Sequence, residues 1–383
     1  MEWLLLSVLA LALAGCDLAP PATITGGPYL QQTGPTSTYV VWQTARPLRG
    51  AVHYGRRSTA EHVERALGAR TMHAVLLRGL SPGTAYVYRV SVAGEITQTF
   101  RFRTAEAGPQ PFTFAAIGDF GSGSPAELRN AALLDREPLD LVLTLGDNVY
   151  PLGTAPEYPR AVFHPLGELM HRLAFWPTLG NHDYGDEERR PSRGTAAAYL
   201  RNFVLPQHPG RERFYSFRYA NADFLAIDSE RSSFAPGSRQ YRWIDRTLSR
   251  SRACWKIPYF HHPVYPEYVR PPASDRVRQA ELVRWLVPLF ERHGVKLVLT
   301  AHEHNYVRSK PVLSGRPDSR GIVYVVAGGG GAALDPLPAN ASRVTAVRGR
   351  FFHHLLVSVN GRRARVEAID TSGRVRDQLR LAC

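Results

Sequence analysis

Two short apolar runs that both end in Gly-Asp constrain the fold of this chain most strongly. The runs FTFAAIGD (112–119) and LDLVLTLGD (139–147) enclose PAELRNAALLDRE (125–137), whose apolar residues recur at helical spacing. A strand, a helix and a second strand in so short a stretch predict a βαβ unit, in which the two strands are parallel neighbours in one sheet. The same alternation continues with strands predicted at 223–229, 255–263 and 295–304 and a helix at 276–292.

The residues before this pattern are of a different kind. Segments such as TSTYVVWQT (36–44) and AYVYRVSV (85–92) are rich in β-branched and aromatic residues, and turn signals separate them. Several short strands at this spacing predict a small all-β sandwich of the immunoglobulin or fibronectin type over 23–104. The composition of AEAGPQP (105–111) is that of a linker, so we expect a second domain over 112–383.

The charge of the chain excludes some functions. Lys and Arg number 47 against 33 Asp and Glu, for a net charge of +14, and 44% of the residues are hydrophobic, as in globular proteins. Only three of the basic residues are lysines, and the arginines are scattered without a run. Scattered arginine argues against a surface that follows a phosphate backbone, so specific nucleic-acid binding is not expected. The positive field should attract anionic small molecules and anionic surfaces.

The chain begins with MEWLLLSVLALALAGC, an apolar run too short to span a bilayer, which takes ~20 residues. Its length suits the core of a signal peptide. The ending LAGC, with Cys16 last, resembles the lipobox of bacterial lipoproteins, although Glu2 stands where such leaders carry Lys or Arg. We therefore expect a lipoprotein-type signal peptide over 1–16 with lipidation at Cys16, and a spacer over 17–22. The protein would then be exported to the periplasm or surface of a bacterium and held on a membrane by its lipid.

Two further cysteines, Cys254 and Cys383, remain after Cys16. An even pair in an oxidising compartment is compatible with one disulfide bond. The alternative is one buried thiol and one thiol at a frayed C-terminus, and the sequence does not decide between the two.

Polar clusters follow the apolar runs or the turns attached to them, in GDFG, GDNVY, GNHDY, FHHPVY and AHEHNY. Ligands of open α/β sheets bind beyond the carboxyl ends of the strands, so we expect these clusters to meet. Together they supply carboxylates, an amide oxygen, imidazoles and a phenol, which form a ligand set for two metal ions. A carboxylate can bridge two such ions, as in sites for phosphoryl displacement. The candidate ligands are Asp119, Asp147, Tyr150, Asn181, His261, His302 and His304.

The blocks, in this order, resemble those of the calcineurin-like metallophosphoesterases and, more narrowly, of the purple acid phosphatases. Many members of the superfamily carry Asp-x-His in the first block, whereas this chain has Gly121 at the histidine position. Its second block supplies Tyr150 instead, as purple acid phosphatases do. The resemblance covers residues 23–383. It implies an α/β metallophosphoesterase domain, with two packed sheets flanked by helices, preceded by the small all-β sandwich.

The resemblance also implies a metal arrangement and two roles beside it. The first ion would be Fe(III) and the second a divalent ion, zinc, iron or manganese. His182 would contact the phosphate or protonate the leaving oxygen, because the ordinary histidine pKa of ~6.5 suits that step. Asp183 would orient His182 or cap the following turn. The first ion would be held by Asp119, Tyr150 and His304, and the second by Asn181, His261 and His302, with Asp147 as the bridge.

Two neighbouring histidines compete for one ligand position. The family pattern His-x-Pro-x-Tyr and the place of Pro263 favour His261 as the ligand. His262 would then support the ligands or bind the substrate. The glycine run at 328–331 lacks the lysine of a phosphate-binding loop, so we expect a flexible or close-packed loop at the rim of the site.

These residues predict an acid phosphatase that hydrolyses phosphate monoesters by attack of a metal-activated hydroxide. The alternative is a phosphodiesterase, nucleotidase or phytase on the same metal core, because loops 185–213 and 264–276 would set the substrate. A surface-binding lipoprotein with an inactive phosphatase fold is disfavoured by the complete ligand set. The sequence leaves the substrate, the second metal and the oligomeric state open. The loop arginines that could bind a polyphosphorylated ligand, or that simply face solvent, are Arg189, Arg190, Arg193, Arg211, Arg213 and Arg270.

Overall fold

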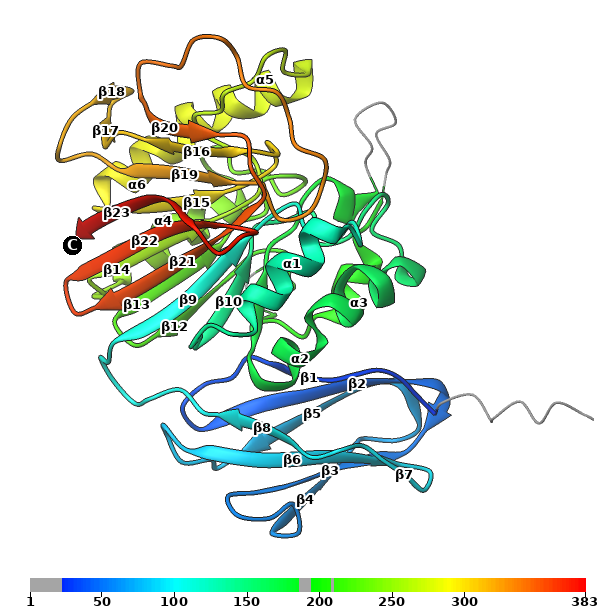
Figure 1. Cartoon of the computed structure of the whole chain (residues 1–383). Helices are drawn as coiled ribbons and strands as arrows, with labels where there is room; N and C mark the ends of the chain where they lie inside the picture. Colours follow the sequence, from blue (N-terminus) through cyan, green and yellow to red (C-terminus); the bar gives the residue numbers. More distant parts are fainter. Residues whose placement is uncertain (1–22, 186–193, 208–209) are drawn as a thin grey trace, which may run out of the picture.

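The computed structural model describes residues 23–185, 194–207 and 210–383, which form two domains (Figure 1). The predicted signal peptide, with Cys16 and the spacer, lies outside the described residues, as do Arg189, Arg190 and Arg193. In the described part of the chain, no helix is long and apolar enough to cross a membrane.

The first domain is a β-sandwich. Alternate residues of its central strand β6 are buried, as a strand with one face on a core requires, and Trp42 and Tyr88 fill that core. One sheet has the order β1-β2-β5, with β1 (Ile24–Gln31), β2 (Ser37–Leu48) and β5 (Arg70–Arg78). The other has the order β4-β3-β6-β7, with β8 paired to β6, and contains β3 (Gly50–Gly55), β4 (His62–Arg65), β6 (Ala85–Val92), β7 (Glu95–Ile96) and β8 (Phe100–Arg103).

The second domain begins with a six-stranded sheet. Its strands β9 and β10 are parallel neighbours, and α1 (Pro125–Leu134) connects them, which confirms the predicted βαβ unit. Ser124 caps α1 by accepting a hydrogen bond from Glu127 N, and Pro125 takes the first helical position. The sheet has the order β11-β10-β9-β21-β22-β23, with β9 (Phe112–Ile117), β10 (Leu141–Thr144), β11 (Phe175–Pro177), β21 (His353–Asn360), β22 (Arg363–Asp370) and β23 (Val375–Ala382).

A seven-stranded sheet packs against the first. Its central strands β13, β14, β15 and β19 are parallel and form near-continuous buried runs, as strands covered on both faces do. The order is β12-β13-β14-β15-β19-β16-β20, with β12 (Tyr215–Tyr219), β13 (Ala222–Ala226), β14 (Trp255–Tyr259), β15 (Leu297–Thr300), β16 (Tyr306–Ser309), β19 (Val323–Ala327) and β20 (Thr345–Gly349). A small hairpin joins β17 (Val312–Leu313) and β18 (Arg316–Pro317).

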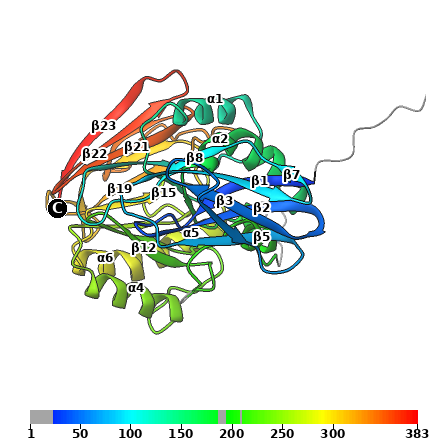
Figure 2. The same cartoon turned by 90° about the horizontal axis from the view of Figure 1, so that it is seen from below.

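Helices cover both outer sides of the paired sheets (Figure 2). The helices α1 and α2 lie on one side, and α4 and α6 lie on the other, with the strands between them. Phe114 of β9 meets Phe224 of β13 edge to face, with ring centroids 5.2 Å apart, in the core between the sheets. The remaining elements are η1 (Ala155–Glu157), η2 (Pro159–Phe163), α2 (His164–Arg172), η3 (His182–Tyr184), α3 (Ala197–Asn202), α4 (Arg239–Arg250), α5 (Ala273–Glu281), η4 (Leu282–Leu286) and α6 (Val287–Arg292). This architecture confirms the predicted fold class.

The two domains are docked through polar and aromatic contacts. Tyr29 of β1 donates a hydrogen bond to the backbone oxygen of Asn202, at the end of α3. His171 of α2 donates from Nδ1 to Pro28 O, and its ring lies 4.0 Å from the Phe100 ring, centroid to centroid. The sandwich therefore packs on helices of the second domain, and Gln31 Nε2 of β1 also donates to Phe175 O of β11 in the six-stranded sheet.

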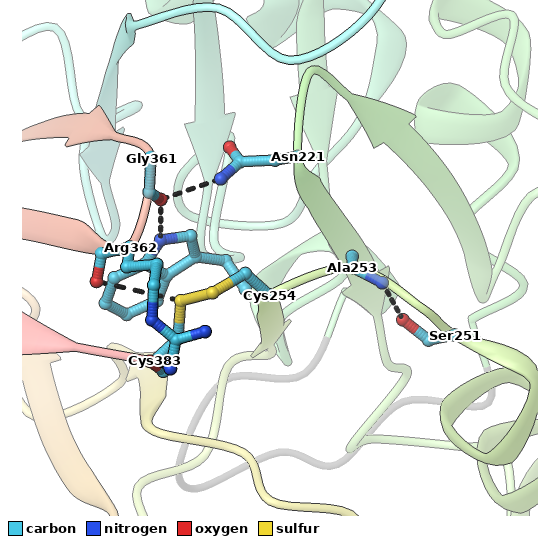
Figure 3. Close-up of a disulfide and its surroundings, with 8 residues drawn as sticks. Asn221, Ser251, Ala253, Cys254, Gly361, Arg362 and Cys383 are labelled. Atoms are coloured by element: carbon cyan, nitrogen blue, oxygen red, sulfur yellow. Dashed lines mark hydrogen bonds between the residues drawn. A yellow bond between two sulfur atoms is a disulfide. The ribbon is translucent and has the colours of Figure 1, made fainter.

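A disulfide bond joins Cys254 to Cys383, with the two Cα atoms 5.6 Å apart (Figure 3). Cys254 immediately precedes β14, and Cys383 immediately follows β23, so the bond ties the seven-stranded sheet to the edge of the six-stranded sheet. Beside it, Gly361 O accepts hydrogen bonds from Asn221 Nδ2 and Trp255 Nε1. The structure thus decides the pairing that the sequence left open.

Candidate metal centre

The polar blocks meet where the strands of the two sheets end. Three blocks follow β9, β10 and β11 of the six-stranded sheet, and two follow β14 and β15 of the seven-stranded sheet. Parallel strands end at the same edge of a sheet, and the packing of the sheets brings the two edges together. The side chains assembled there are those of Asp119, Asp147, Tyr150, Asn181, His261, His302 and His304, all of the predicted ligands.

One group of atoms surrounds the Tyr150 hydroxyl. Its oxygen lies 3.1 Å from Asp119 Oδ1, 3.1 Å from Asp147 Oδ2 and 3.1 Å from His304 Nε2. A single phenolic proton cannot serve three neighbours, so a cation is the group that would satisfy them. Burial and the two carboxylates raise the pKa of Tyr150 well above its usual value, so the phenolate forms there only beside a strong positive charge.

A second group surrounds the Asn181 amide oxygen. Asn181 Oδ1 lies 3.0 Å from His261 Nε2 and 3.1 Å from His302 Nδ1, and these two nitrogens are 3.1 Å apart. One amide oxygen and two imidazole nitrogens so close together have few protons to share between them. Such a cluster is the donor set of a borderline divalent cation.

Two of the imidazoles, those of His261 and His304, also form a hydrogen bond on the side that faces away from the cluster, through their outer nitrogen. His261 Nδ1 lies 2.9 Å from Leu145 O, and His304 Nδ1 lies 2.8 Å from Ala333 O. A carbonyl oxygen can only accept, so both outer nitrogens carry a proton, which leaves each inner Nε2 as the nitrogen that a metal ion would bind. The residues therefore fit a pair of metal ions.

Asp147 lies between the two groups. Its Oδ2 is 3.1 Å from the Tyr150 hydroxyl and 3.3 Å from His261 Nε2, and its Oδ1 accepts a hydrogen bond from His182 N. Burial lowers the pKa of His261, but Asp147 and Asp119 outweigh it and raise that pKa to about 10. The site thus attracts positive charge, and Asp147 has the position of a bridging ligand.

The backbone at three ligands is in the left-handed region. The φ angles are 55° at Asp119, 50° at Asp147 and 71° at His302, where side chains other than glycine are disfavoured. Ala301, directly before His302, is outside that region. Strain of this kind collects at functional sites.

His182 lies beside Asp147 and Tyr150 of the cluster. Its Nδ1 lies 2.6 Å from Pro151 O, which can only accept, so Nδ1 carries a proton. Its Nε2 lies 3.9 Å from Asp147 Oδ2, and its ring packs 4.3 Å from the Tyr150 ring, centroid to centroid. The free ring nitrogen thus faces the ligands, as a phosphate contact would.

Asp183 differs from its expected orienting role. Its Oδ2 accepts hydrogen bonds from Gly180 N at 2.9 Å and from Asn148 Nδ2 at 2.8 Å. Among the described residues it is Pro151 O, and not Asp183, that orients the His182 ring. We correct the catalytic assignment accordingly: Asp183 joins the loop of the second block to the loop of the third.

His262 also differs from its expected contact with substrate. It is buried, its Nδ1 lies 2.9 Å from Glu230 Oε1, and its ring packs 4.3 Å from the His302 ring, centroid to centroid. It therefore packs against the ligand His302 on the side away from the cluster, which is the supporting role that the sequence also allowed.

The glycine run at 328–331 is close-packed. A Cβ on Gly328 would lie 2.1 Å from Glu303 O, and one on Gly330 would lie 2.3 Å from Gly118 O. The loop therefore presses its backbone directly against the first and last ligand blocks, in agreement with a close-packed rim.

Sequence reasoning missed some residues around the ligands. Asp275 Oδ2 lies 3.1 Å from His302 Nε2, and Asn148 holds Asp183 as described above. Asn148 stands inside the block GDNVY and could have been noticed as a polar residue after a strand. Asp275 belongs to the first turn of α5, where an acidic residue is ordinary, so nothing in the sequence marks it.

Comparison with known proteins finds phosphoesterases and acid phosphatases. The profile of the calcineurin-like phosphoesterases matches residues 112–306, and that of the purple acid phosphatase N-terminal domain matches residues 26–104. Acid phosphatase type 7 of Homo sapiens is 26% identical, over 98% of this chain and 94% of its own length. Purple acid phosphatase 15 of Arabidopsis thaliana is 26% identical, over 68% of this chain and 53% of its own length.

The fold is similar to that of a solved purple acid phosphatase from seeds of yellow lupin (Lupinus luteus). The TM-score is 0.78, the superposition covers 93% of this chain and 74% of the lupin chain, and the sequence identity is 17%. At that identity the likeness concerns the fold.

Proposed function

Because the chain belongs to the calcineurin-like phosphoesterase family and carries the N-terminal domain of purple acid phosphatases, we propose that it is a dimetal acid phosphatase acting on phosphate monoesters. One observation carries the proposal. The outer nitrogens of His261 and His304 donate to carbonyl oxygens, so their inner Nε2 atoms converge with the carboxylates and the amide oxygen on one small volume.

The seven converging residues hold two metal ions in this proposal. The group around Tyr150 would hold Fe(III), because a trivalent ion best stabilises a phenolate whose pKa its surroundings raise. The group around Asn181 offers neutral oxygen and nitrogen donors, which suit zinc, iron or manganese as a divalent ion.

When bound, such a pair of ions supplies positive charge for phosphate oxygens and lowers the pKa of a water molecule. The chain itself contributes a proton carrier. Since His182 Nδ1 donates to Pro151 O, Nε2 is the atom that can bind a phosphate oxygen or pass a proton to the leaving oxygen. Asn181 is neutral, so it adds no negative charge against an anionic substrate.

We also propose that the protein is exported and held on a membrane by a lipid on Cys16. The disulfide between Cys254 and Cys383 supports an oxidising compartment, such as the periplasm or the cell surface.

The loop arginines give weak support to a polyphosphorylated substrate. Arg213 Nη1 donates to the Tyr184 hydroxyl, and its guanidinium lies 5.6 Å from the centre of the Tyr184 ring, so this side chain is engaged in packing. Arg211 and Arg270 are exposed. Monoesters are therefore the proposed class, and diester, nucleotide or phytate hydrolysis is an outcome of the test below.

The test is phosphate release from monoesters, diesters, phytate and pyrophosphate at about pH 5 and about pH 8. Asp147→Asn serves as the blank, because a lost bridging carboxylate weakens both ion sites. Asp245→Asn is the control, since Asp245 pairs with Arg292 and His293 on the surface. Monoester turnover on the acid side that Asp147→Asn abolishes would support the proposal. A preference for diesters would assign the protein to the phosphodiesterases instead. A protein that binds metals but hydrolyses none of these substrates would be a binding protein.

A further inference from the structure

His302 is held differently from the other two ligand imidazoles. The outer nitrogens of His261 and His304 donate to backbone carbonyls, whereas His302 Nε2 lies 3.1 Å from the Asp275 carboxylate. In the described part of the chain, His302 is thus the one imidazole of the three that meets a carboxylate on its outer side. Its inner nitrogen, Nδ1, lies 3.1 Å from both Asn181 Oδ1 and His261 Nε2.

The carboxylate comes from outside the central sheets. Asp275 lies in the first turn of α5, is only 8% exposed, and accepts a further hydrogen bond from Ser274 Oγ on Oδ1. The helix itself is fastened, because Arg278 donates to Glu230 O and Gln279 donates to Val264 O. The position of the carboxylate is therefore set by contacts that do not involve His302.

His302 needs such a partner more than the other two ligand imidazoles do. Its φ of 71° places the side chain on a disfavoured backbone, and the tilted contact with the His262 ring limits the ring's position but does not select which nitrogen is protonated. A carboxylate on Nε2 selects the tautomer with its proton on Nε2 and its lone pair on Nδ1. It also makes the imidazole a more basic ligand.

We propose that Asp275 is a positioning residue that sets the affinity of the second metal site through His302. The inference rests on the dimetal centre of the proposed function, and it assigns to α5 the task of tuning one of the two ions. The first ion has no ligand in contact with Asp275, so its affinity should be independent of this carboxylate.

The experiment compares metal binding by purified wild-type protein, Asp275→Ala and Asp275→Asn. Metal content is measured after dialysis against a weak chelator, and zinc affinity is measured by titration of the metal-free proteins. We expect Asp275→Ala to keep one ion per chain where wild type keeps two, with about 10- to 100-fold weaker zinc binding at the second site. Asp275→Asn should lie between them, because its amide oxygen can still accept from His302 Nε2.

Asp245→Ala is the matched control. Asp245 Oδ1 lies 2.8 Å from His293 Nε2, so this variant also removes a carboxylate from an imidazole, but on the surface and away from the ligands. It should bind both ions as wild type does. The melting temperatures of the metal-free variants separate the proposed effect from misfolding. The inference requires that Asp275→Asn melt at the same temperature as wild type and still bind the second ion more weakly.

Two outcomes overturn the inference. In one, Asp275→Ala and Asp275→Asn retain both ions at wild-type affinity while Asp147→Asn loses them, so the dimetal centre stands and the role of Asp275 fails. In the other, Asp275→Asn loses both ions equally, or both Asp275 variants have melting temperatures well below that of wild type. Either result would mean that Asp275 stabilises the fold rather than the second metal site. A wild-type protein that binds no ion overturns the proposed function first.

Discussion

A side chain at Gly121 would collide with the backbone of Asn148: its Cβ would lie 1.8 Å from Asn148 O. The loop of the second block therefore occupies the space that a histidine at the first block would need. Tyr150 N donates to Gly121 O at 2.8 Å, so the same close approach delivers the phenol to the ligands. The absence of a histidine at position 121 and the presence of Tyr150 among the ligands therefore have the same structural cause, the close approach of the two loops.

Replacing Gly121 by alanine should displace the Tyr150 loop. The clash is with backbone atoms, so the loss of unfolding free energy should reach at least about 3 kcal/mol, the upper range for overpacking. Urea unfolding measures it. Gly167→Ala is the control, because a Cβ there meets nothing within 4 Å and the helix should gain up to about 1 kcal/mol. Equal effects of the two changes would contradict the close approach.

Replacing Tyr150 tests the proposed ferric site. A phenolate bound to Fe(III) absorbs visible light by charge transfer, so the iron-loaded wild-type protein should be coloured and iron-loaded Tyr150→Phe should not. Tyr184→Phe is the control, because that hydroxyl donates to Asp228, just after β13, and not to a predicted ligand. A visible band that survives in Tyr150→Phe would mean that another group binds the iron.

Asp183→Ala should lower both stability and metal retention. It leaves Gly180 N and the Asn148 amide without their buried acceptor, and each such group costs about 1–3 kcal/mol. Asp183→Asn keeps an acceptor and should cost less. If Asp183→Asn instead abolished turnover without loss of stability, the residue would have the catalytic role that we withdrew.

Acid should destabilise the protein through a buried histidine in β21. Burial lowers the pKa of His354 to about 3, while its Nδ1 lies 3.1 Å from Asn130 Oδ1. A lowered folded-state pKa gives stability that is present above the unfolded pKa of ~6.5 and is lost as the pH falls toward 3, by about 2 kcal/mol at pH 5. His354→Gln keeps a donor for Asn130 but does not titrate, so its urea midpoint should change less between neutral and acid pH. An identical change would refute the assignment.

The disulfide should stabilise the fold without affecting the site. The cysteines are 129 positions apart, so replacing both by serine should cost about 2–5 kcal/mol in unfolding free energy. Cys254 precedes β14 while His261 follows it, which places bond and ligands at opposite ends of a strand. Metal content per folded molecule should therefore be unchanged. A loss of metal in the double variant would mean that the disulfide also holds the ligands in position.

Part of this structure was accessible from the sequence because strand periodicity and ligand chemistry are local. The βαβ unit followed from apolar runs and a helical spacing, and the ligands followed from polar residues placed directly after those runs. The role of Asp183 was not accessible in this way, since its partners come from another block and an aspartate after a histidine fits several roles equally well.

By itself, the sequence determined which side chains could bind metal and that they would meet, since the ends of parallel strands share one edge of a sheet. The tertiary structure alone decided the rest: the nitrogen that each imidazole turns toward the cluster, the place of His262 behind His302, the bond between Cys254 and Cys383, and the contact of Asp275 with His302. The physical reason is that these choices depend on atoms from elements far apart in the chain, brought together by the packing of the two sheets and α5, and a contact of that kind leaves no periodic trace in the sequence.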